Sequence, residues 1–232
     1  MTKAMILAAG RGERMRPLTD RLPKALLEAA GKPLIVHLIE HLARAGVSEL
    51  VVNVSHFADQ IEERLGNGAL LGVHVSYSRE ESPLETGGGI AYALPLLGDA
   101  PFLVVNSDVY SDFDFRRLEP AAAALARGDR DAHLVLVDNP PEHPQGDFVL
   151  RDSRVLAEGT PRLTFSGIGV YSPALFSTVR RGSRSPLMAV LTPAMARGRV
   201  GGEHHRGLWL DVGTPARLDQ LEEQLRAQAK RS

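Results

Sequence analysis

Compact apolar runs and helix-like patterns alternate along the first half of the chain. The apolar runs, which are typical of buried strands, occupy residues 5–9, 50–54, 73–77, 101–106 and 132–137. Between them, apolar residues recur with helical spacing over residues 33–45, 58–65, 89–97 and 113–126. This alternation predicts βαβ units, and therefore a mostly parallel central sheet with helices on both faces.

The pattern changes after Asp138, where several prolines interrupt the chain. Shorter strands are predicted at residues 148–150, 154–156 and 163–171, and helices at residues 185–196 and 215–229. One face of the last helix, which we expect to pack against the core, carries Leu218, Leu221 and Leu225. We therefore predict a single domain in which a core, residues 1–138, is joined by a lobe, residues 139–232, that forms one side of a cleft.

A loop rich in glycine and basic residues follows the first predicted strand. It contains Gly10, Gly12, Arg11, Arg14 and, further on, Lys24. Glycines after a buried strand let backbone N–H groups approach an anion, and arginine and lysine add positive charge. The loop matches neither the dinucleotide-binding fingerprint nor the P-loop, because a third glycine and a Gly-Lys-Ser/Thr sequence are missing. It nevertheless predicts a polyphosphate-binding loop.

Composition narrows the possible partners. The 232 residues carry a formal net charge of −1, so the chain has no general attraction for nucleic acid. There is no cysteine, which excludes disulfides and thiolate metal sites. No apolar run approaches the ~20 residues of a membrane helix, and the first strand leaves no room for a signal peptide. We expect a cytoplasmic protein without a membrane partner; the oligomeric state stays open, and a monomer is compatible with the sequence.

Two aspartates follow predicted strands at widely separated positions. Asp108 comes after the strand that ends in Asn106, and Asp211 precedes a helix start at Thr214 and Pro215. Ligands in open α/β sheets bind at the carboxyl ends of strands, and carboxylates there are typical ligands of hard cations. Each aspartate alone is also compatible with a simple turn. Together they predict a Mg²⁺ site.

The glycine-rich loop resembles the signature of the sugar-1-phosphate nucleotidyltransferases. The matching residues are Leu7-Ala8-Ala9-Gly10-Arg11-Gly12-Glu13-Arg14, Pro17-Leu18-Thr19 and Pro23-Lys24. The resemblance implies a Rossmann-like nucleotide-diphospho-sugar transferase fold, with residues 1–138 as nucleotide-binding core and residues 139–232 as sugar-binding lobe plus C-terminal helix. It implies nucleotide contacts from Ala9, Gly10, Gly12, Glu13, Arg14 and Lys24. It also assigns the second magnesium carboxylate to Asp211.

A second motif, Pro83-Leu84-Glu85-Thr86-Gly87-Gly88-Gly89, is similar to the family segment that contacts the nucleobase through main-chain atoms. We expect its three glycines to lie in a loop before a helix. The form P-L-E-T-G-G-G resembles the N-acetylmuramate-1-phosphate uridylyltransferase branch of the family. Glu80 lies where relatives place an acceptor for a base N–H, which suits uracil and guanine alike. The expected nucleobase contacts are therefore Glu80, Pro83, Thr86 and Gly87.

Sugar contacts are expected from the end of one strand and from the second half of the chain. The resemblance implies Asn106, Gly146, Asp147 and Ser166, although Asp147 is equally compatible with a plain turn. The family motif E-K-P, which contacts sugar and phosphate, is absent; residues 156–161 read Leu-Ala-Glu-Gly-Thr-Pro. This absence argues against a glucose- or mannose-type pocket.

The resemblance implies an enzyme that transfers UMP from UTP to N-acetylmuramic acid α-1-phosphate in peptidoglycan recycling. Arg14 is expected to neutralise the departing pyrophosphate, Lys24 to bridge the reacting phosphates, and Mg²⁺ on Asp108 and Asp211 to assist. Two alternatives remain. One is mannose-1-phosphate guanylyltransferase or another sugar-1-phosphate nucleotidyltransferase, and the other is a non-catalytic sugar-nucleotide sensor.

Overall fold

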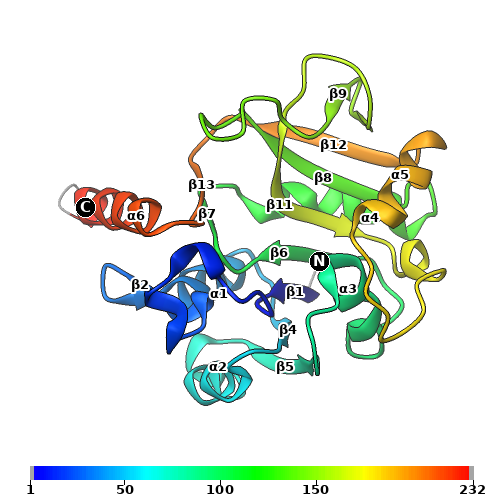
Figure 1. Cartoon of the computed structure of the whole chain (residues 1–232). Coiled ribbons are helices and arrows are strands. Elements are labelled where there is room, and N and C mark those ends of the chain that lie inside the picture. Colours follow the sequence, from blue (N-terminus) through cyan, green and yellow to red (C-terminus); the bar gives the residue numbers. More distant parts are fainter. Residues whose placement is uncertain (1–2, 230–232) are drawn as a thin grey trace.

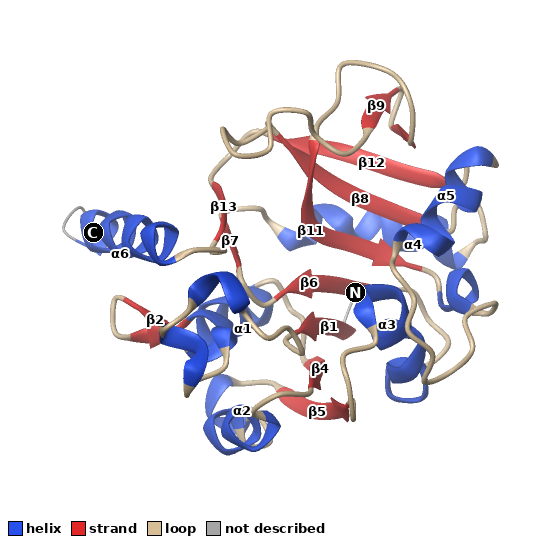
Figure 2. Ribbon diagram, in the orientation of Figure 1, coloured by secondary structure: helices blue, strands red, loops and turns tan. Residues whose placement is uncertain are grey.

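The centre of the molecule is a nine-stranded sheet, seen in a computed structural model that describes residues 3–229 (Figures 1 and 2). In spatial order its strands are β5 (His74–Arg79), β4 (Glu49–Val54), β1 (Lys3–Leu7), β6 (Phe102–Asn106), β11 (Thr164–Tyr171), β8 (Ala132–Val137), β12 (Val200–His205), β10 (Arg154–Leu156) and β9 (Val149–Arg151).

The sheet is mostly parallel, as the alternating pattern predicts. Strands β5, β4, β1 and β6 pair in parallel, and β12 pairs in parallel with β8. Strand β11 is antiparallel to both β6 and β8, and β10 is antiparallel to both β12 and β9. Seven strands therefore run in one direction, and β11 and β10 run in the other.

Helices cover both faces of the sheet. One face packs against α1 (Leu34–Arg44), α2 (Ala58–Leu65) and α4 (Glu119–Ala126), and the other against α3 (Glu85–Leu97) and α5 (Met188–Ala196). The alternation of side chains along β6 shows why: Leu103 and Val105 enter the first core, whereas Phe102 and Val104 enter the second. Among the described residues, no helix has both the length and the apolar character to cross a membrane.

The last helix, α6 (Pro215–Ala229), extends away from the sheet in Figure 1. It is tied to the body by a third apolar cluster, in which Leu218 and Leu221 contact Met15 and Val212 and the partly buried Leu225 packs alongside. Leu218 and Leu221 thus pack against the core, as predicted. Since Met15 belongs to the glycine-rich loop, this cluster connects α6 directly to that loop.

Short elements complete the fold. Two-stranded ribbons are formed by β7 (Val109–Ser111) with β13 (Trp209–Asp211), and by β2 (Glu28–Ala29) with β3 (Lys32–Pro33). Single turns of 3₁₀ helix occupy Glu13–Met15, Leu18–Asp20, Lys24–Leu26, Ala69–Leu71, Phe115–Leu118 and Pro173–Phe176.

Several predicted boundaries were wrong for local reasons. The first strand ends at Leu7, because the amide of Ala8 bonds to the Asn53 side chain (2.8 Å). The predicted helix over residues 113–126 is a 3₁₀ turn followed by α4, since the Asp114 carboxylate accepts the Arg116 amide (3.1 Å) and caps the turn. The helix predicted from residue 185 begins at Met188.

The largest correction concerns the three glycines. They lie inside α3, in its first turns, and are buried, whereas the sequence placed them in a loop before the helix. Helix α3 can begin at Glu85 because this residue adopts a left-handed conformation (φ +60°) that turns the chain into the helix. The predicted division at residue 138 stays a prediction, and the structure joins its two sides in one sheet, with β11 between β6 and β8.

Candidate active site

Two cavities meet at the carboxyl ends of the parallel strands. The first, of about 230 Å³, is lined by most of the expected nucleotide contacts: Ala9, Gly10, Lys24, Glu80, Pro83 and Thr86. The second, of about 550 Å³, is lined by Arg14, Asp147, Ser166 and Asp211. Asn106 and Asp108 line both cavities, so the residues that the sequence assigned to strand ends stand where the two spaces join.

Strand register explains this meeting point. Leu7, at the end of β1, pairs with Asn53 of β4 on one side and with Asn106 of β6 on the other. The amide of Ser107 then donates to the carbonyl of Leu7 (3.0 Å), which holds the start of the Asp108 turn against the glycine-rich loop. Neighbouring parallel strands thus end at one edge, and their last side chains share one space.

The glycine-rich loop is folded tightly upon itself. Gly12 has φ +62°, and a Cβ there would lie 3.0 Å from the Thr19 side chain and 3.1 Å from Cβ of Lys24, so only glycine fits easily. The Thr19 hydroxyl donates to the Gly12 carbonyl (2.8 Å), and Met15 is fully buried. These contacts bring Lys24 back to the strand ends, where its ammonium group bonds to the Asp108 carboxylate.

The β7–β13 ribbon brings the two predicted metal ligands together. Asp211 pairs with Val109 across the ribbon, and the amide of Val212 donates to the carbonyl of Asp108 (2.9 Å). Asp108 and Asp211 are therefore adjacent although they are far apart in sequence. Burial, and next the charge of Asp108, raise the pKa of Asp211. Two neighbouring carboxylates of this kind favour a cation between them.

Basic side chains surround the carboxylates. Arg217, at the start of α6, donates to the Asp211 carboxylate (3.0 Å) and is itself largely buried. Arg14 also lies here, because a Cβ on Gly213 would be 3.1 Å from its guanidinium and 3.1 Å from the Asp211 carboxylate. The structure therefore gathers three cationic side chains, Lys24, Arg14 and Arg217, beside Asp108 and Asp211. Arg217 also pairs with the Glu142 carboxylate, and arginine and lysine are residues suited to binding phosphate groups.

On the nucleotide side, Glu80 is a buried carboxylate with both oxygens in use. Its Oε1 accepts from the Asn53 amide (2.7 Å), and its Oε2 accepts from the backbone N–H of Leu84 (2.9 Å). Asn53 in turn accepts the amide of Ala8 (2.8 Å). This network ties the ends of β1 and β4 to the Pro83–Thr86 wall of the first cavity.

On the opposite side, the expected sugar contacts take part in local structure as well. Asp147 accepts the amide of Phe165 (2.8 Å) and lies 3.0 Å from the ring of His143. The Ser166 hydroxyl donates to the carbonyl of Val135 (2.7 Å) within an irregularity of β11, although Ser166 still lines the cavity. Gly146 has φ +61° and sits where a Cβ would be 2.6 Å from Asn139, so it shapes the turn before Asp147.

A sequence model of the nucleotidyl transferase family matches residues 3–228 of this chain. The chain belongs to this family. The N-acetylmuramate alpha-1-phosphate uridylyltransferase of Neisseria meningitidis serogroup B is 53% identical over 224 residues, which cover 95% of this chain and 96% of that protein. The mannose-1-phosphate guanylyltransferase catalytic subunit beta of Xenopus tropicalis is 31% identical, over 92% of this chain and 61% of that protein.

A solved nucleotidyltransferase structure has the same fold. A putative glucose-1-phosphate thymidylyltransferase from Bacillus anthracis, in complex with a sucrose, superposes with a TM-score of 0.84 at 20% identity, covering 97% of this chain and 96% of that one. The Rossmann-like nucleotidyltransferase fold expected from the sequence is therefore confirmed.

The individual site roles stay predictions, but the structure shows where each residue lies. Gly12, Glu13, Gly87 and Gly146 lie outside the lining of both cavities. Arg14 lines the second cavity and not the first, so its guanidinium is placed beside the aspartates.

Sequence reasoning on this nucleotidyltransferase missed several residues that line the cavities, among them Asn53, Trp209 and Arg217. Asn53 was a polar residue inside an otherwise apolar strand, which is a usable signal. Trp209 was noted only within an apolar run, yet its indole donates to the carbonyl of Ser166 (2.9 Å). Arg217 follows the G-T-P helix start by two positions and looks like any helical surface residue.

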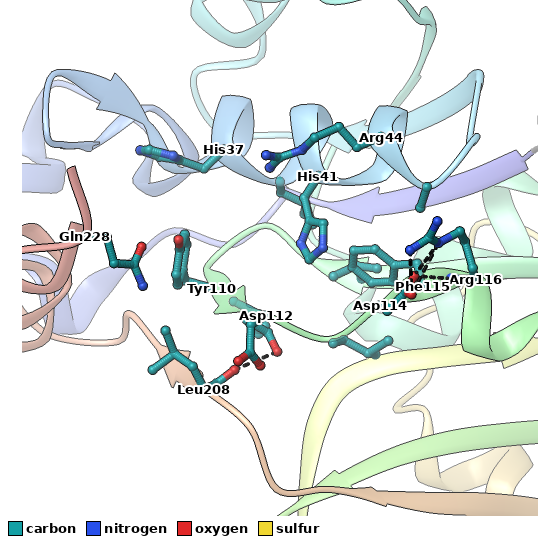
Figure 3. A pocket seen from close by; sticks show the side chains of 16 residues that line it. His37, His41, Arg44, Tyr110, Asp112, Asp114, Phe115, Arg116, Leu208 and Gln228 are labelled. Atoms are coloured by element: carbon teal, nitrogen blue, oxygen red, sulfur yellow. Dashed lines mark hydrogen bonds and ion pairs between the residues drawn. The ribbon is translucent and has the colours of Figure 1, made fainter. Parts of the chain in front are cut away.

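A further cavity, of about 470 Å³, lies between α1, the β7–β13 ribbon and the Asp112–Arg116 turn (Figure 3). His41 projects from α1 toward this space, opposite Asp112 and Asp114, whereas Arg44 lies along the helix, where its Nε donates to the carbonyl of Glu40 (3.2 Å). It shares only Val109 with the second cavity, and none of the predicted phosphate-binding residues line it. We therefore place the nucleotidyltransferase site at the two cavities that share Asp108.

Proposed function

We propose that the protein is a uridylyltransferase that joins UTP and N-acetylmuramic acid α-1-phosphate, giving UDP-N-acetylmuramate and pyrophosphate. The carrying observation is 53% identity, over nearly the full length of both chains, to a protein named for that activity. The two cavities joined at Asp108 support it, since one is lined by residues predicted to contact the nucleotide and the other by residues predicted to contact the sugar. The product would feed the recycling of peptidoglycan sugars.

In this reaction an oxygen of the sugar phosphate attacks the α-phosphorus of UTP in line, and pyrophosphate leaves. No protein nucleophile is needed, so catalysis consists of positioning and of neutralising charge. Lys24 lies at the junction of the cavities and bonds Asp108, where it can turn toward the reacting phosphates. Arg14 stands beside Asp211 and would bind phosphate oxygens as charge develops.

Asp108 and Asp211 fit a magnesium ion. They are adjacent, their mutual repulsion contributes to the raised pKa of Asp211, and Mg²⁺ usually takes one or two carboxylates together with water and substrate phosphates. Within residues 3–229 no group of three or more His, Cys, Asp or Glu side chains is arranged for a metal, which suits a site completed by substrate. When bound, the ion would supply charge neutralisation at the phosphates.

The test is a pyrophosphate-release assay with four nucleoside triphosphates crossed with a panel of sugar 1-phosphates. The proposal predicts highest kcat/KM for UTP with N-acetylmuramic acid α-1-phosphate. Faster turnover of GTP with mannose 1-phosphate would instead assign the activity of the 31% identical guanylyltransferase. Binding of UDP-N-acetylmuramate without turnover of any pair would indicate a sugar-nucleotide sensor.

A further inference from the structure

Two glycines of α3, Gly87 and Gly88, face a neighbouring segment of the chain. Residues 183–186, here called the strap, precede α5 and lie against the first turn of α3. A Cβ on Gly87 would be 2.9 Å from the Pro186 carbonyl oxygen, and one on Gly88 would collide with the carbonyl oxygen of Ser183. Both glycines are therefore needed so that the backbone of the strap can approach the helix closely.

Backbone hydrogen bonds from Ser185 of the strap reach both ends of this turn, at Leu84 and at Gly88. The amide of Ser185 donates to the carbonyl of Leu84 (3.0 Å), and the amide of Gly88 donates to the carbonyl of Ser185 (2.9 Å). On its inner side, the same turn is held by the buried carboxylate of Glu80 through the Leu84 amide (2.9 Å). The wall of the nucleotide cavity is thus clamped between Glu80 and the strap.

A single ion pair joins side chains across this contact. The Nε of Arg184 forms an ion pair with Oε1 of Glu85 at 2.7 Å, and Glu85 lines the first cavity next to Thr86. Glu85 is also the residue whose left-handed conformation (φ +60°) starts the helix, at a position where an L side chain is disfavoured. The pair therefore holds a strained residue in place at the cavity edge.

We infer that the strap sets the position of the nucleotide-binding wall, with Arg184 as a positioning residue that acts through Glu85. The inference rests on the proposed function, since it takes the first cavity to hold the nucleoside triphosphate. It gives the three glycines a role different from direct contact with the base. Gly87 and Gly88 make room for the strap, which in turn fixes Pro83, Glu85 and Thr86, whereas Gly89 makes room for the Glu80 carboxylate.

The test is titration calorimetry of UTP with Arg184→Gln, Glu85→Gln and the double variant. Exposed ion pairs have small effects, and the Arg184 side chain is 73% exposed, so each single variant should weaken UTP binding about two- to fivefold. The double variant should lose little more than either single variant. KM for the sugar phosphate and the melting temperature should stay unchanged, which a purely structural role would not produce.

Arg181→Gln is the matched control, because Arg181 lies close to the strap and packs over the Tyr92 ring (4.9 Å) and not against Glu85. Gly88→Ala should displace the strap and weaken UTP binding more than Arg184→Gln does. Unchanged UTP binding in Arg184→Gln, or an equal loss in Arg181→Gln, would overturn the role of the strap. If the wild-type protein turns over none of the substrate pairs, the proposed function fails and not the role of the strap. If it prefers another nucleotide, the same titrations with that nucleotide test whether the strap positions the nucleotide-binding wall.

Discussion

At the scale of single residues, Glu80 shows how a buried charge is made tolerable. The residue is only 6% exposed. Oε1 of its carboxylate accepts a hydrogen bond from the Asn53 side chain, and Oε2 accepts one from the Leu84 amide. Gly89 adds to the fit, since a Cβ there would lie 2.7 Å from Oε1 of Glu80. The glycine, the amide and the carboxylate form one unit beneath the nucleotide cavity.

Glu80→Gln should therefore destabilise the fold and weaken UTP binding. The introduced amide nitrogen would face a donor, either Asn53 or the Leu84 N–H, and leave it without an acceptor, at a cost of about 1–3 kcal/mol. Urea unfolding measures this loss. Glu81→Gln is the control, because Glu81 is the exposed neighbour and its replacement should change stability by less than about 0.5 kcal/mol. Equal stability of the two variants would contradict the network described here.

His41 predicts a pH dependence of stability. Burial, and next the charge of Arg44, lower the pKa of His41 below 6.5, against the opposing charges of Asp114 and Asp112. The folded state thus prefers the neutral ring, so this contribution is present above pH 6.5 and is lost as pH falls toward the lowered pKa. His41→Phe, which can keep the contact with Phe115, should lose less stability than wild type between neutral and mildly acidic pH. Thermal melts across this range test it, with the exposed His74→Phe as control; parallel curves for wild type and His41→Phe would refute it.

At the scale of elements, the β7–β13 ribbon brings the two proposed metal ligands together. Each of its strands has three residues, and together they bring Asp108 and Asp211 side by side. Arg217 from α6 then donates to both the backbone carbonyl and the carboxylate of Asp211 (3.0 Å each). A ribbon and a helix start, neither part of the main sheet, thus position one of the two proposed metal ligands.

Asp211→Asn should separate activity from stability. Because burial and Asp108 raise the pKa of Asp211, its ionised form is disfavoured in the folded chain, and a neutral amide should not lower the melting temperature at neutral pH. Loss of the carboxylate should nevertheless reduce kcat on the order of 100-fold, as for other electrostatic groups at a transition state. Asp219→Asn, on the exposed side of α6, should leave kcat unchanged. A kcat for Asp211→Asn close to that of wild type would remove Asp211 from the site.

The elements also show which predictions a sequence supports. Long buried strands such as β6 and β8 can be predicted from the sequence, because their continuous apolar runs are longer than those of turns. Asp108 was found because it follows a strand end, and Lys24 because Pro23-Lys24 matches the family signature. The three-residue strands β7 and β13 are too short to show a periodic pattern that would predict them. Each forms only by pairing with the other, which is distant in the sequence. The glycines of α3 were misplaced because Gly87 and Gly88 pack against the strap and Gly89 packs against Glu80, contacts that no local pattern reveals.

At the scale of the whole molecule, the cluster beneath α6 connects the C-terminal helix to the glycine-rich loop. Leu221 is fully buried there with Met15 of the glycine-rich loop and with Val212, the neighbour of Asp211. Packing at one end of the chain therefore supports chemistry encoded near the other end. The sequence predicted that the leucines of α6 pack against the core, but not that they pack against Met15 of the glycine-rich loop.

Leu221→Ala should cost about 2–5 kcal/mol of stability, the range for buried leucines that leave a cavity. It should also lower kcat/KM at temperatures where the protein is still folded, because Met15 and Val212 lose a shared contact. Leu225→Ala, which removes a partly buried side chain of the same helix, should have a smaller effect on both. Urea unfolding with activity measured in parallel tests this, and a destabilised Leu221→Ala with wild-type kcat/KM would show that the cluster serves stability alone.

The position of β11 has a consequence for how the chain is made. Strands β6 and β8 do not pair with each other; both pair with β11, whose residues follow β8 in the chain. While the ribosome has delivered only the stretch through β8, the edge of β6 and both edges of β8 lack the partners they have in the finished sheet. Open strand edges promote aggregation. The first 138 residues are therefore expected to depend on the rest of the chain, or on a chaperone, until Thr164–Tyr171 inserts and closes the sheet.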